Sequence, residues 1–183
     1  TDGVEAANAV CLGTARGQGY GGQWSAWISG PNSNAIDSYS SEDFSLVNMR
    51  NQVVIDDVST LAECELGEDC LENPVQFNGS NQPVHSNVGI WTGTNNAGQS
   101  SGNSCLDWST DQDDNNATIG NPRSKAGEWT GSDATLASCN EINGIYCIEH
   151  EASTAPPVTT PPVTTPPVTT PPGTPPPVTT PPV

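Results

Sequence analysis

The chain has 183 residues, and its 4 Lys and Arg residues against 21 Asp and Glu residues give a formal net charge of −17. Such an acidic surface repels nucleic acid and anionic membranes, so both classes of partner are excluded. No apolar run reaches the length of a membrane span or has the form of a signal peptide, so we expect no membrane insertion. The chain starts at Thr1 rather than Met, which we take as compatible with secretion after removal of a leader.

The first predicted element is a short helix over residues 4–12, where alanine and other apolar residues recur at helical spacing. Several glycines follow between Gly13 and Gly22, and they predict that this helix does not continue far. Polar and apolar residues then alternate over residues 23–29, which is the pattern of a strand.

The rest of the domain is expected to contain little regular structure and much loop. We expect strands over 52–55, 88–93 and 144–149, a second short helix that starts at 57–61 with Asp57 or Ser59 as its cap, and a long ordered loop over 66–87. A polar segment rich in Asn, Gly, Ser and Asp separates the last two strands. Disulfides and buried tryptophans would hold such a domain together. The sequence therefore predicts an α+β head domain over residues 1–151.

Residues 152–183 form a separate tail, in which Pro-Pro-Val-Thr-Thr repeats from Pro156 onward and the register changes once, at residues 171–174. Proline lacks a backbone donor and fixes φ, so we expect a polyproline II rod of about 100 Å rather than a helix or strand. Successive Thr-Thr pairs then point to three sides of the rod, as suits O-linked glycans. A plain spacer is the alternative. The candidate glycosylation sites are Thr159, Thr160, Thr164, Thr165, Thr169, Thr170, Thr174, Thr179 and Thr180.

Six cysteines in a head with so little basic charge are typical of three disulfides, and hence of an oxidising compartment. The residues alone allow many connectivities. A zinc–thiolate site is the competing interpretation, but it requires close pairs such as Cys-x-x-Cys. The nearest pair, Cys64 and Cys70, has five residues between its members. We therefore expect an extracellular or cell-surface protein with three disulfides.

A set of motifs occurs in order along the second half of the head: residues 90–94 (Ile-Trp-Thr-Gly-Thr), 105–108 (Cys-Leu-Asp-Trp), 128–130 (Glu-Trp-Thr), 138–139 (Ser-Cys) and 145–149 (Ile-Tyr-Cys-Ile-Glu). This order resembles the C-terminal half of endostatin, a collagen-derived domain with a C-type-lectin-like fold. It is more similar still to bacterial and protist endostatin-like domains of unknown function. Cys11 and the segment 24–29 resemble the N-terminal half of that group, and residues 30–87 match poorly.

The resemblance implies a C-type-lectin-like α+β fold and a nested pairing of cysteines. The implied pairs are Cys11–Cys147 and Cys105–Cys139, with Cys64–Cys70 as a local clip that is an addition in this chain. The zinc and heparin binding of endostatin is not implied here, because its N-terminal histidines and arginine-rich face have no counterpart. The basic residues of the chain are only Arg16, Arg50, Arg123 and Lys125.

No catalytic constellation is recognisable, so we do not expect an enzyme. The two histidines, His85 and His150, are accompanied by no hydrolase, metalloprotease or phosphate-loop motif. A histidine at the edge of a domain is most often solvated. We expect no cofactor, with calcium as the one candidate.

The acidic run that begins at Asp111 is the calcium candidate, because Asp111, Asp113 and Asp114 offer hard oxygen ligands close together. An EF-hand loop needs Gly at its sixth position and Glu at its twelfth, where this chain has Asn116 and Pro122. We therefore interpret the run as a solvated loop and keep calcium as the alternative.

Tryptophans and two sequons are the remaining candidates for contact with sugars. The five tryptophans, Trp24, Trp27, Trp91, Trp108 and Trp129, could stack on sugar rings, but we expect them to be core residues. Asn78 and Asn116 begin Asn-x-Ser/Thr sequons, both in predicted loops.

Three functions are consistent with this pattern. The first is a structural glycoprotein whose head and glycosylated rod assemble into a fibre, appendage or surface coat. The second is a lectin-like adhesion module, binding carbohydrate or protein, on a stalk. The third is an accessory module of a secreted hydrolase. We expect the first. It assumes that the rod is ordered, and a Pro/Thr rod is ordered only where neighbouring chains or glycans hold it.

Overall fold

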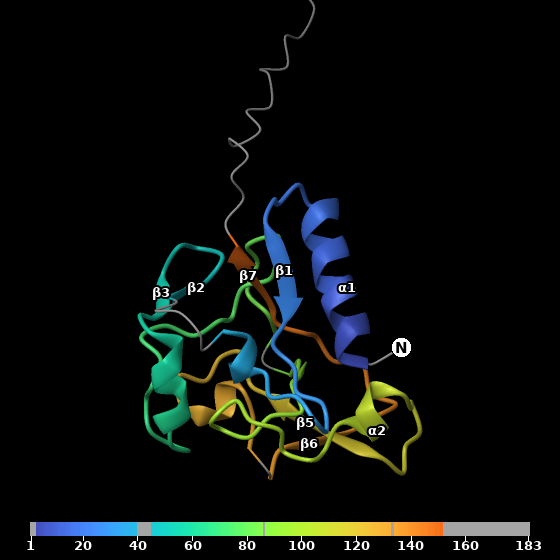
Figure 1. Ribbon diagram of the computed structural model, residues 1–183. Coiled ribbons are helices and arrows are strands. Elements are labelled where there is room, and N and C mark those ends of the chain that lie inside the picture. The colour runs from blue at the N-terminus through green and yellow to red at the C-terminus, as the bar shows by residue number, and fades with distance from the viewer. Residues whose placement is uncertain (1–2, 40–44, 86, 133, 152–183) are drawn as a thin grey trace, which may run out of the picture.

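The computed structural model describes residues 3–39, 45–85, 87–132 and 134–151 (Figure 1). The tail over 152–183, with its expected polyproline II conformation and glycosylated threonines, lies outside the described residues. The elements are α1 (Gly3–Gly17), β1 (Gln23–Ala26), η1 (Ile36–Ser38), β2 (Leu46–Val47), β3 (Val53–Ile55), η2 (Val58–Glu63), β4 (Ile90–Trp91), α2 (Cys105–Trp108), β5 (Asn116–Gly120), η3 (Gly127–Trp129), β6 (Leu136–Ser138) and β7 (Cys147–Glu151). The expectation of a disulfide-stapled α+β domain is confirmed at this level.

Helix α1 is longer than the sequence predicted, because Gly13 does not end it. A side chain at Gly13 would meet nothing within 4 Å, so this glycine faces open space, while the buried stripe of Ala7, Cys11 and Ala15 continues past it. The helix ends instead in a Schellman motif, in which the Tyr20 amide donates to the Ala15 carbonyl and the Gly19 amide to the Arg16 carbonyl. Gly19 has a φ of +83°, which glycine adopts without strain.

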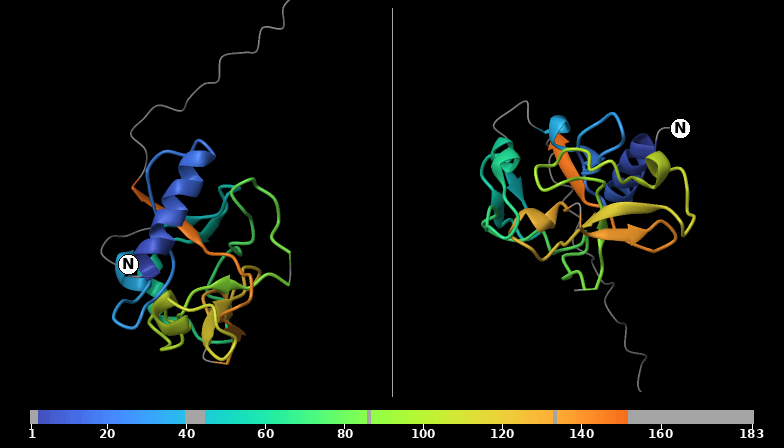
Figure 2. Two further views of the ribbon diagram at one scale, coloured as in Figure 1. Left: turned by 90° about the vertical axis from the view of Figure 1, so that its right-hand side faces the viewer. Right: turned by 90° about the horizontal axis from the view of Figure 1, so that it is seen from below.

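The strands form three small antiparallel sheets: β1–β7, β2–β3 and β4–β5–β6. Helix α1 lies alongside the β1–β7 pair, and β5, β6 and α2 lie below it (Figures 1 and 2). The predicted strands over 23–29, 52–55, 88–93 and 144–149 correspond to β1, β3, β4 and β7, with shifted ends. Strands β2, β5 and β6 were not predicted. Strand β2 has only two residues, Leu46 and Val47, and β5 and β6 mix polar and apolar residues without a regular alternation, so none of the three shows the sequence pattern of a strand.

The predicted second helix is a 3₁₀ helix, η2, over Val58–Glu63. Asp57 is its N-cap, as one of the two predicted candidates, and its carboxylate accepts a hydrogen bond from the Ser59 amide at 2.8 Å. Hydrogen bonds from the Ser59 side chain and from its amide lower the pKa of the Asp57 carboxyl. The predicted loop over 66–87 contains no helix or strand in its described part.

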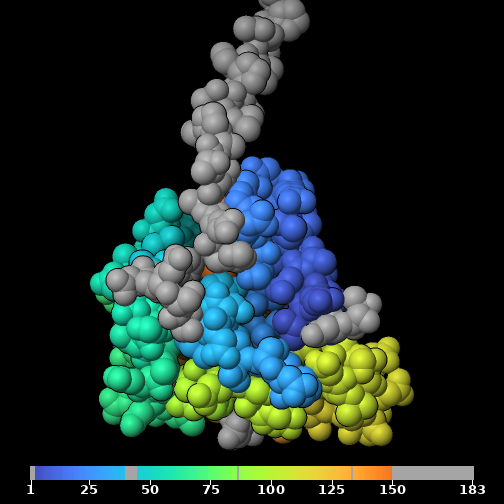
Figure 3. All heavy atoms as spheres, in the orientation of Figure 1, coloured from blue at the N-terminus to red at the C-terminus, as the bar shows by residue number. Residues whose placement is uncertain are grey.

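Element α2 is a turn in the left-handed region rather than an ordinary helix, since all four of its residues have φ between 49° and 60°. It is held from both ends. Cys105 is bonded to Cys139, and the Trp108 indole donates to the Ser29 carbonyl at 2.9 Å. In Figure 3 this yellow region lies directly below the start of α1.

The centre of the core is a run of four buried aromatic rings. Trp27 lies 5.5 Å from Tyr39 and 5.0 Å from Trp129, and Trp129 lies 5.6 Å from Tyr146, measured between ring centroids. The Trp27 indole donates to the Thr130 hydroxyl at 2.6 Å. The interpretation of the tryptophans as core residues is thus confirmed for Trp27 and Trp129, whereas Trp24, Trp91 and Trp108 are only partly buried.

The three disulfides join Cys11 to Cys147, Cys64 to Cys70 and Cys105 to Cys139. These are the pairs that the endostatin-like resemblance implies. The first closes a separation of 136 residues and fastens α1 to β7, while Cys64 and Cys70 are 6 positions apart. Closing the longer loop removes more entropy from the unfolded chain.

Removing the long-range disulfide should therefore destabilise the head more than removing the local one. In the chain-entropy model we expect a loss of about 5 kcal/mol for the double variant Cys11→Ala/Cys147→Ala and about 2 kcal/mol for Cys64→Ala/Cys70→Ala. Urea unfolding followed by tryptophan fluorescence measures both, with Cys64→Ala/Cys70→Ala as the matched control. Equal losses in the two variants would contradict the prediction.

Candidate functional site

A cleft of about 950 Å³ is lined by parts of the chain that are distant in sequence. Most of the lining comes from α1 from Cys11 onward with Tyr20 and Trp24, the segment 45–51 around β2, the segment 75–85, and residues 144–149 leading into β7. Val88, Ile90, Pro122 and Trp129 complete it. Most of the lining side chains are apolar, and we call this hollow the apolar cleft. Its position follows from the Cys11–Cys147 disulfide, because both half-cystines belong to its lining.

The rim of the apolar cleft exposes large apolar side chains. Val47 is 50% exposed and Tyr20 is 37% exposed, and the half-buried Trp24, Met49 and Phe77 line the cleft with them. The rings of Tyr20 and Trp24 lie 5.8 Å apart. A rim with several aromatic rings is unusual on a surface that is otherwise acidic, and such patches commonly mark interaction sites.

Hydrogen bonds hold the rim in place. The Tyr20 hydroxyl donates to the Gly79 carbonyl at 2.8 Å, which ties the 75–85 segment to the end of α1. The Trp24 indole donates to the Gly21 carbonyl at 2.7 Å. The Arg50 guanidinium lies 4.0 Å from the centroid of the Phe77 ring, a cation–π contact that fixes this ring. The rim is therefore built from rings that are already oriented.

The buried part of the lining includes Trp129 and Tyr146. The Tyr146 hydroxyl donates to the Trp129 carbonyl at 2.8 Å. The Trp129 indole Nε1 is a buried donor that has no hydrogen-bond partner among the described residues. Leaving such a group unpaired costs about 1–3 kcal/mol, so an acceptor placed against it would be favourable.

The apolar cleft carries little charge for so acidic a protein. Among the described residues that line it, the ionisable side chains apart from tyrosines are His85 and Glu149. His85 is exposed, as expected for a solvated histidine. The side chain of His150 lies outside the described residues. With one carboxylate and one histidine, the lining suits a neutral ligand better than a charged one.

The calcium candidates do not come together as a site. Asp111, Asp113 and Asp114 are all exposed, and the Asp111 and Asp114 carboxylates accept hydrogen bonds from the side chains of Gln112 and Asn115. Within the described ranges, no three His, Cys, Asp or Glu side chains are grouped so that they could hold a metal ion.

The two sequon asparagines are both exposed, but only one lies in a loop. Asn78 belongs to the 75–85 segment, where its side-chain oxygen accepts hydrogen bonds from the amides of Ser80 and Gln82 at 3.0 and 2.9 Å. Asn116 is the first residue of β5, so the prediction of a loop at this position was wrong. Its segment pairs with β6 through Ser138.

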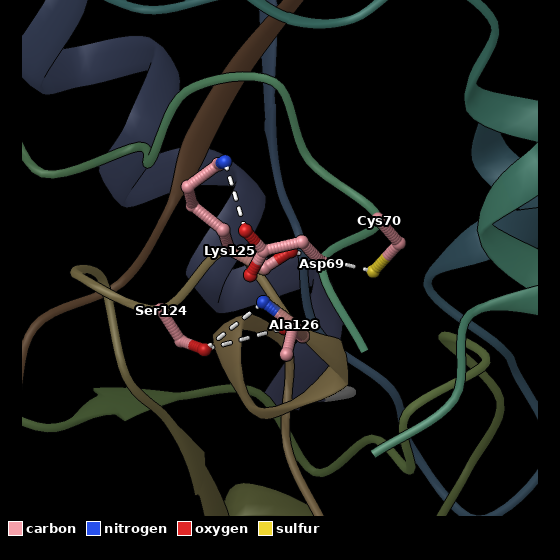
Figure 4. Close-up of polar contacts among 5 residues, drawn as sticks. All are labelled: Asp69, Cys70, Ser124, Lys125 and Ala126. Carbon is pink, nitrogen blue, oxygen red and sulfur yellow. Dashed lines mark hydrogen bonds and ion pairs between the residues drawn. The ribbon is translucent and has the colours of Figure 1, made fainter. Parts of the chain in front are cut away.

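Polar contacts join the loop around Cys70 to the loop around Lys125, on the side of the head that has the Cys64–Cys70 disulfide (Figure 4). The amides of Cys70 and Leu71 donate to the Lys125 carbonyl at 3.0 and 2.8 Å, and Lys125 Nζ lies 3.0 Å from Asp69 Oδ2. The Ser124 hydroxyl accepts from the Ala126 amide at 3.1 Å. These contacts are structural, and the exposed ion pair adds at most about 1 kcal/mol.

Sequence reasoning missed the cleft residues Val47, Met49 and Phe77. All three lie in residues 30–87, outside the motifs on which the resemblance to endostatin-like domains is based. The available signal was a group of apolar residues at 46, 47 and 49 inside a polar segment.

No helix among the described residues is both long enough and apolar enough to cross a bilayer.

Calcium should not stabilise the head, because the three aspartates are exposed and two of them, Asp111 and Asp114, are already hydrogen-bonded locally through their carboxylates. We expect an unchanged melting temperature when millimolar CaCl₂ is added to EDTA-treated protein, with MgCl₂ as the control for ionic strength. A rise with calcium alone would restore the loop as a metal site.

Alkaline pH should destabilise the head through its two buried tyrosines. Burial raises the pKa of Tyr39 to about 12, against a smaller lowering by its hydrogen bond with Ser25, and burial raises the pKa of Tyr146 well above its usual value. Both groups favour the folded state below the unfolded pKa, near 10, and this advantage is lost as the pH rises toward the folded pKa.

The loss should be about 1.4 kcal/mol per buried tyrosine by pH 11. Urea unfolding at pH 8 and pH 11 measures it, and Tyr39→Phe should remove about half of the difference. Ser25→Ala is the matched control, because it removes the same 2.7 Å hydrogen bond but keeps the phenol. A pH dependence that Tyr39→Phe leaves unchanged would show that Tyr39 is not responsible.

Comparison with known proteins gives the chain no family. No protein-family model matches the sequence, and no curated protein matches it. The geometry of the apolar cleft and the composition of the tail are therefore the observations from which a function can be argued.

Proposed function

We propose that the chain is an extracellular structural glycoprotein, a subunit of a fibre, appendage or surface coat, in which the head carries a glycosylated Pro/Thr rod that mediates assembly. This proposal rests on the combination, in one chain, of a disulfide-bonded head and a proline-rich repeat tail. The head has three disulfides within its described residues. The tail is a neutral repeat that cannot form a core. Disulfides of this kind persist in oxidising compartments, which supports an extracellular or cell-surface location.

The head is proposed to be an endostatin-like domain with a C-type-lectin-like fold. Support comes from the nesting of its disulfides, because Cys105–Cys139 lies inside the loop that Cys11–Cys147 closes. The rings of the motif residues Trp91 and Trp108 lie 6.0 Å apart, and the motif residues Trp129 and Tyr146 pack with their rings 5.6 Å apart. These ring contacts between motif residues support the proposed family.

A binding module on a stalk is the second candidate, and the apolar cleft favours it. A hollow of about 950 Å³ with a half-buried Trp24 and an unpaired buried indole could take a carbohydrate face or a protein segment. The two candidates differ in what the tail does. In a structural subunit the tail makes the assembly, whereas in a binding module it only spaces the head from its anchor.

Deleting residues 152–183 tests this difference. We expect the truncated chain to lose regular filaments in electron microscopy, because the rod supplies the assembly contacts, while the head keeps its circular dichroism and melting temperature. The control replaces the tail by a Gly/Ser segment of equal length, which preserves reach but not stiffness or hydroxyl spacing.

Intact-mass spectrometry on the native protein gives the second readout. Excess mass on the Pro/Thr peptide together with filaments supports a glycosylated structural subunit. Filaments formed by the truncated chain would show that the rod is not the assembly element. Monomers with unmodified threonines would return the tail to a spacer and favour the binding module.

A further inference from the structure

We propose that the apolar cleft receives the proline-rich break in the tail, residues 171–178, of a second copy of the chain. The inference rests on the proposed function, since it names the contact through which the structural subunit would assemble. Its starting point is the rim, where Val47, Tyr20 and Trp24 leave apolar surface uncovered. An exposed apolar patch on an acidic head requires a partner of matching chemistry.

The distribution of charge along the chain favours the tail over a second head as the partner of the cleft. All 25 Lys, Arg, Asp and Glu residues lie at or before Glu151, so the head carries the whole formal charge of −17 and residues 152–183 carry none of it. Two heads that approach each other therefore repel, while the tail can approach a head without repulsion. Among the described residues of the cleft lining, Glu149 is the one carboxylate.

The surface of the cleft matches the chemistry of a polyproline II segment. Such segments bind grooves lined by aromatic rings, because the preformed helix loses little entropy on binding. Tyr20, Trp24 and Phe77 supply three rings. Proline has no N–H, so a proline-rich backbone offers only acceptors, and the groove must supply donors. The amide side chains of Gln18 and Gln82, which are both exposed, are donors in the lining.

The break in the repeat is the part of the tail that suits the cleft best. Residues 156–170 contain six threonines in three repeats, and glycans on these would be too bulky to enter. Residues 171–178 contain five prolines and a single threonine, Thr174, so they present the most rings and the fewest glycan sites. The change of register thus has a function: it leaves one bare stretch on a coated rod.

The length of the tail indicates that the contact is made between copies. The 15 residues over 156–170 would span about 47 Å as a polyproline II rod, whereas a head of this size is about 40 Å across. This stretch has two prolines in every five residues and no glycine, so we expect it to stay extended. Residues 171–178 would then lie beyond their own head. A head-to-tail contact of this kind does not close on itself and generates an open filament.

Cross-linking within the full chain tests the contact. A photo-reactive phenylalanine analogue replaces Val178, and ¹⁵N-labelled and unlabelled chains are mixed in equal amounts before assembly. We expect cross-linked peptides of mixed isotope composition that join the tail to segments 45–51 or 75–85. Mixed pairs show that the contact is between copies, and the attachment site shows whether it is the cleft.

A pair of surface variants gives the second readout. Val47→Glu places a charge on the rim at a side chain that is 50% exposed, and Leu136→Glu does the same on β6, at a side chain that is 44% exposed and outside the cleft. We expect Val47→Glu to raise the critical concentration for assembly at least tenfold and Leu136→Glu to leave it within twofold. Circular dichroism checks that both variants fold.

The outcomes separate this inference from the proposed function. Filaments with cross-links outside the cleft, or equal effects of the two variants, would overturn the cleft contact and leave the structural role standing. Cross-links only between peptides of the same isotope would mean that the tail folds onto its own head, which also overturns the inference. Mixed pairs in the cleft without filaments would support the contact and overturn the fibre. If the chain forms no filaments and gives no mixed pairs, both the cleft contact and the structural role are overturned.

Discussion

The Cys11–Cys147 disulfide is the constraint on which the rest of the head depends. It joins the middle of α1 to the first residue of β7, and β7 pairs with β1, so the two ends of the described chain become one packed unit. The aromatic run from Tyr39 to Tyr146 lies beside this unit, because Trp27 directly follows β1 and Tyr146 directly precedes β7. The same bond places two walls of the apolar cleft.

The sequence allowed the class of the head and its fastening to be predicted, because these depend on few and specific residues. Cysteines and tryptophans are rare, and their order carried the resemblance that implied the pairing. Ends of elements were less predictable. Gly13 is tolerated within α1 because its position faces open space, and Gly19 ends the helix because two amides find carbonyls there. Both outcomes depend on surroundings that a pattern of glycines does not contain.

The apolar cleft could not be predicted, because it has no local signature. Its lining joins segments from Cys11 to Glu149, and each contributes residues that are unremarkable in their own stretch. Val47 is the outward residue of the two-residue strand β2, and Phe77 lies in a loop under Arg50. Only the folded arrangement brings these side chains to one hollow. Strands β2, β5 and β6 escaped prediction for a related reason, since pairing partners rather than their own composition make them strands.

The division of charge links the two parts of the chain. A head with a formal charge of −17 and few cations is soluble but self-repelling, and such a head does not assemble through its general surface. The proposed assembly needs a neutral element with a long reach, and a polyproline rod, the conformation expected for the tail, would be both without a core of its own. It would also need a weakly charged place to bind on the head, as the apolar cleft is proposed to be. In the proposed filament, repulsion between heads would keep them apart while the rod joins them, so the acidity that opposes unspecific association would also favour a regular spacing.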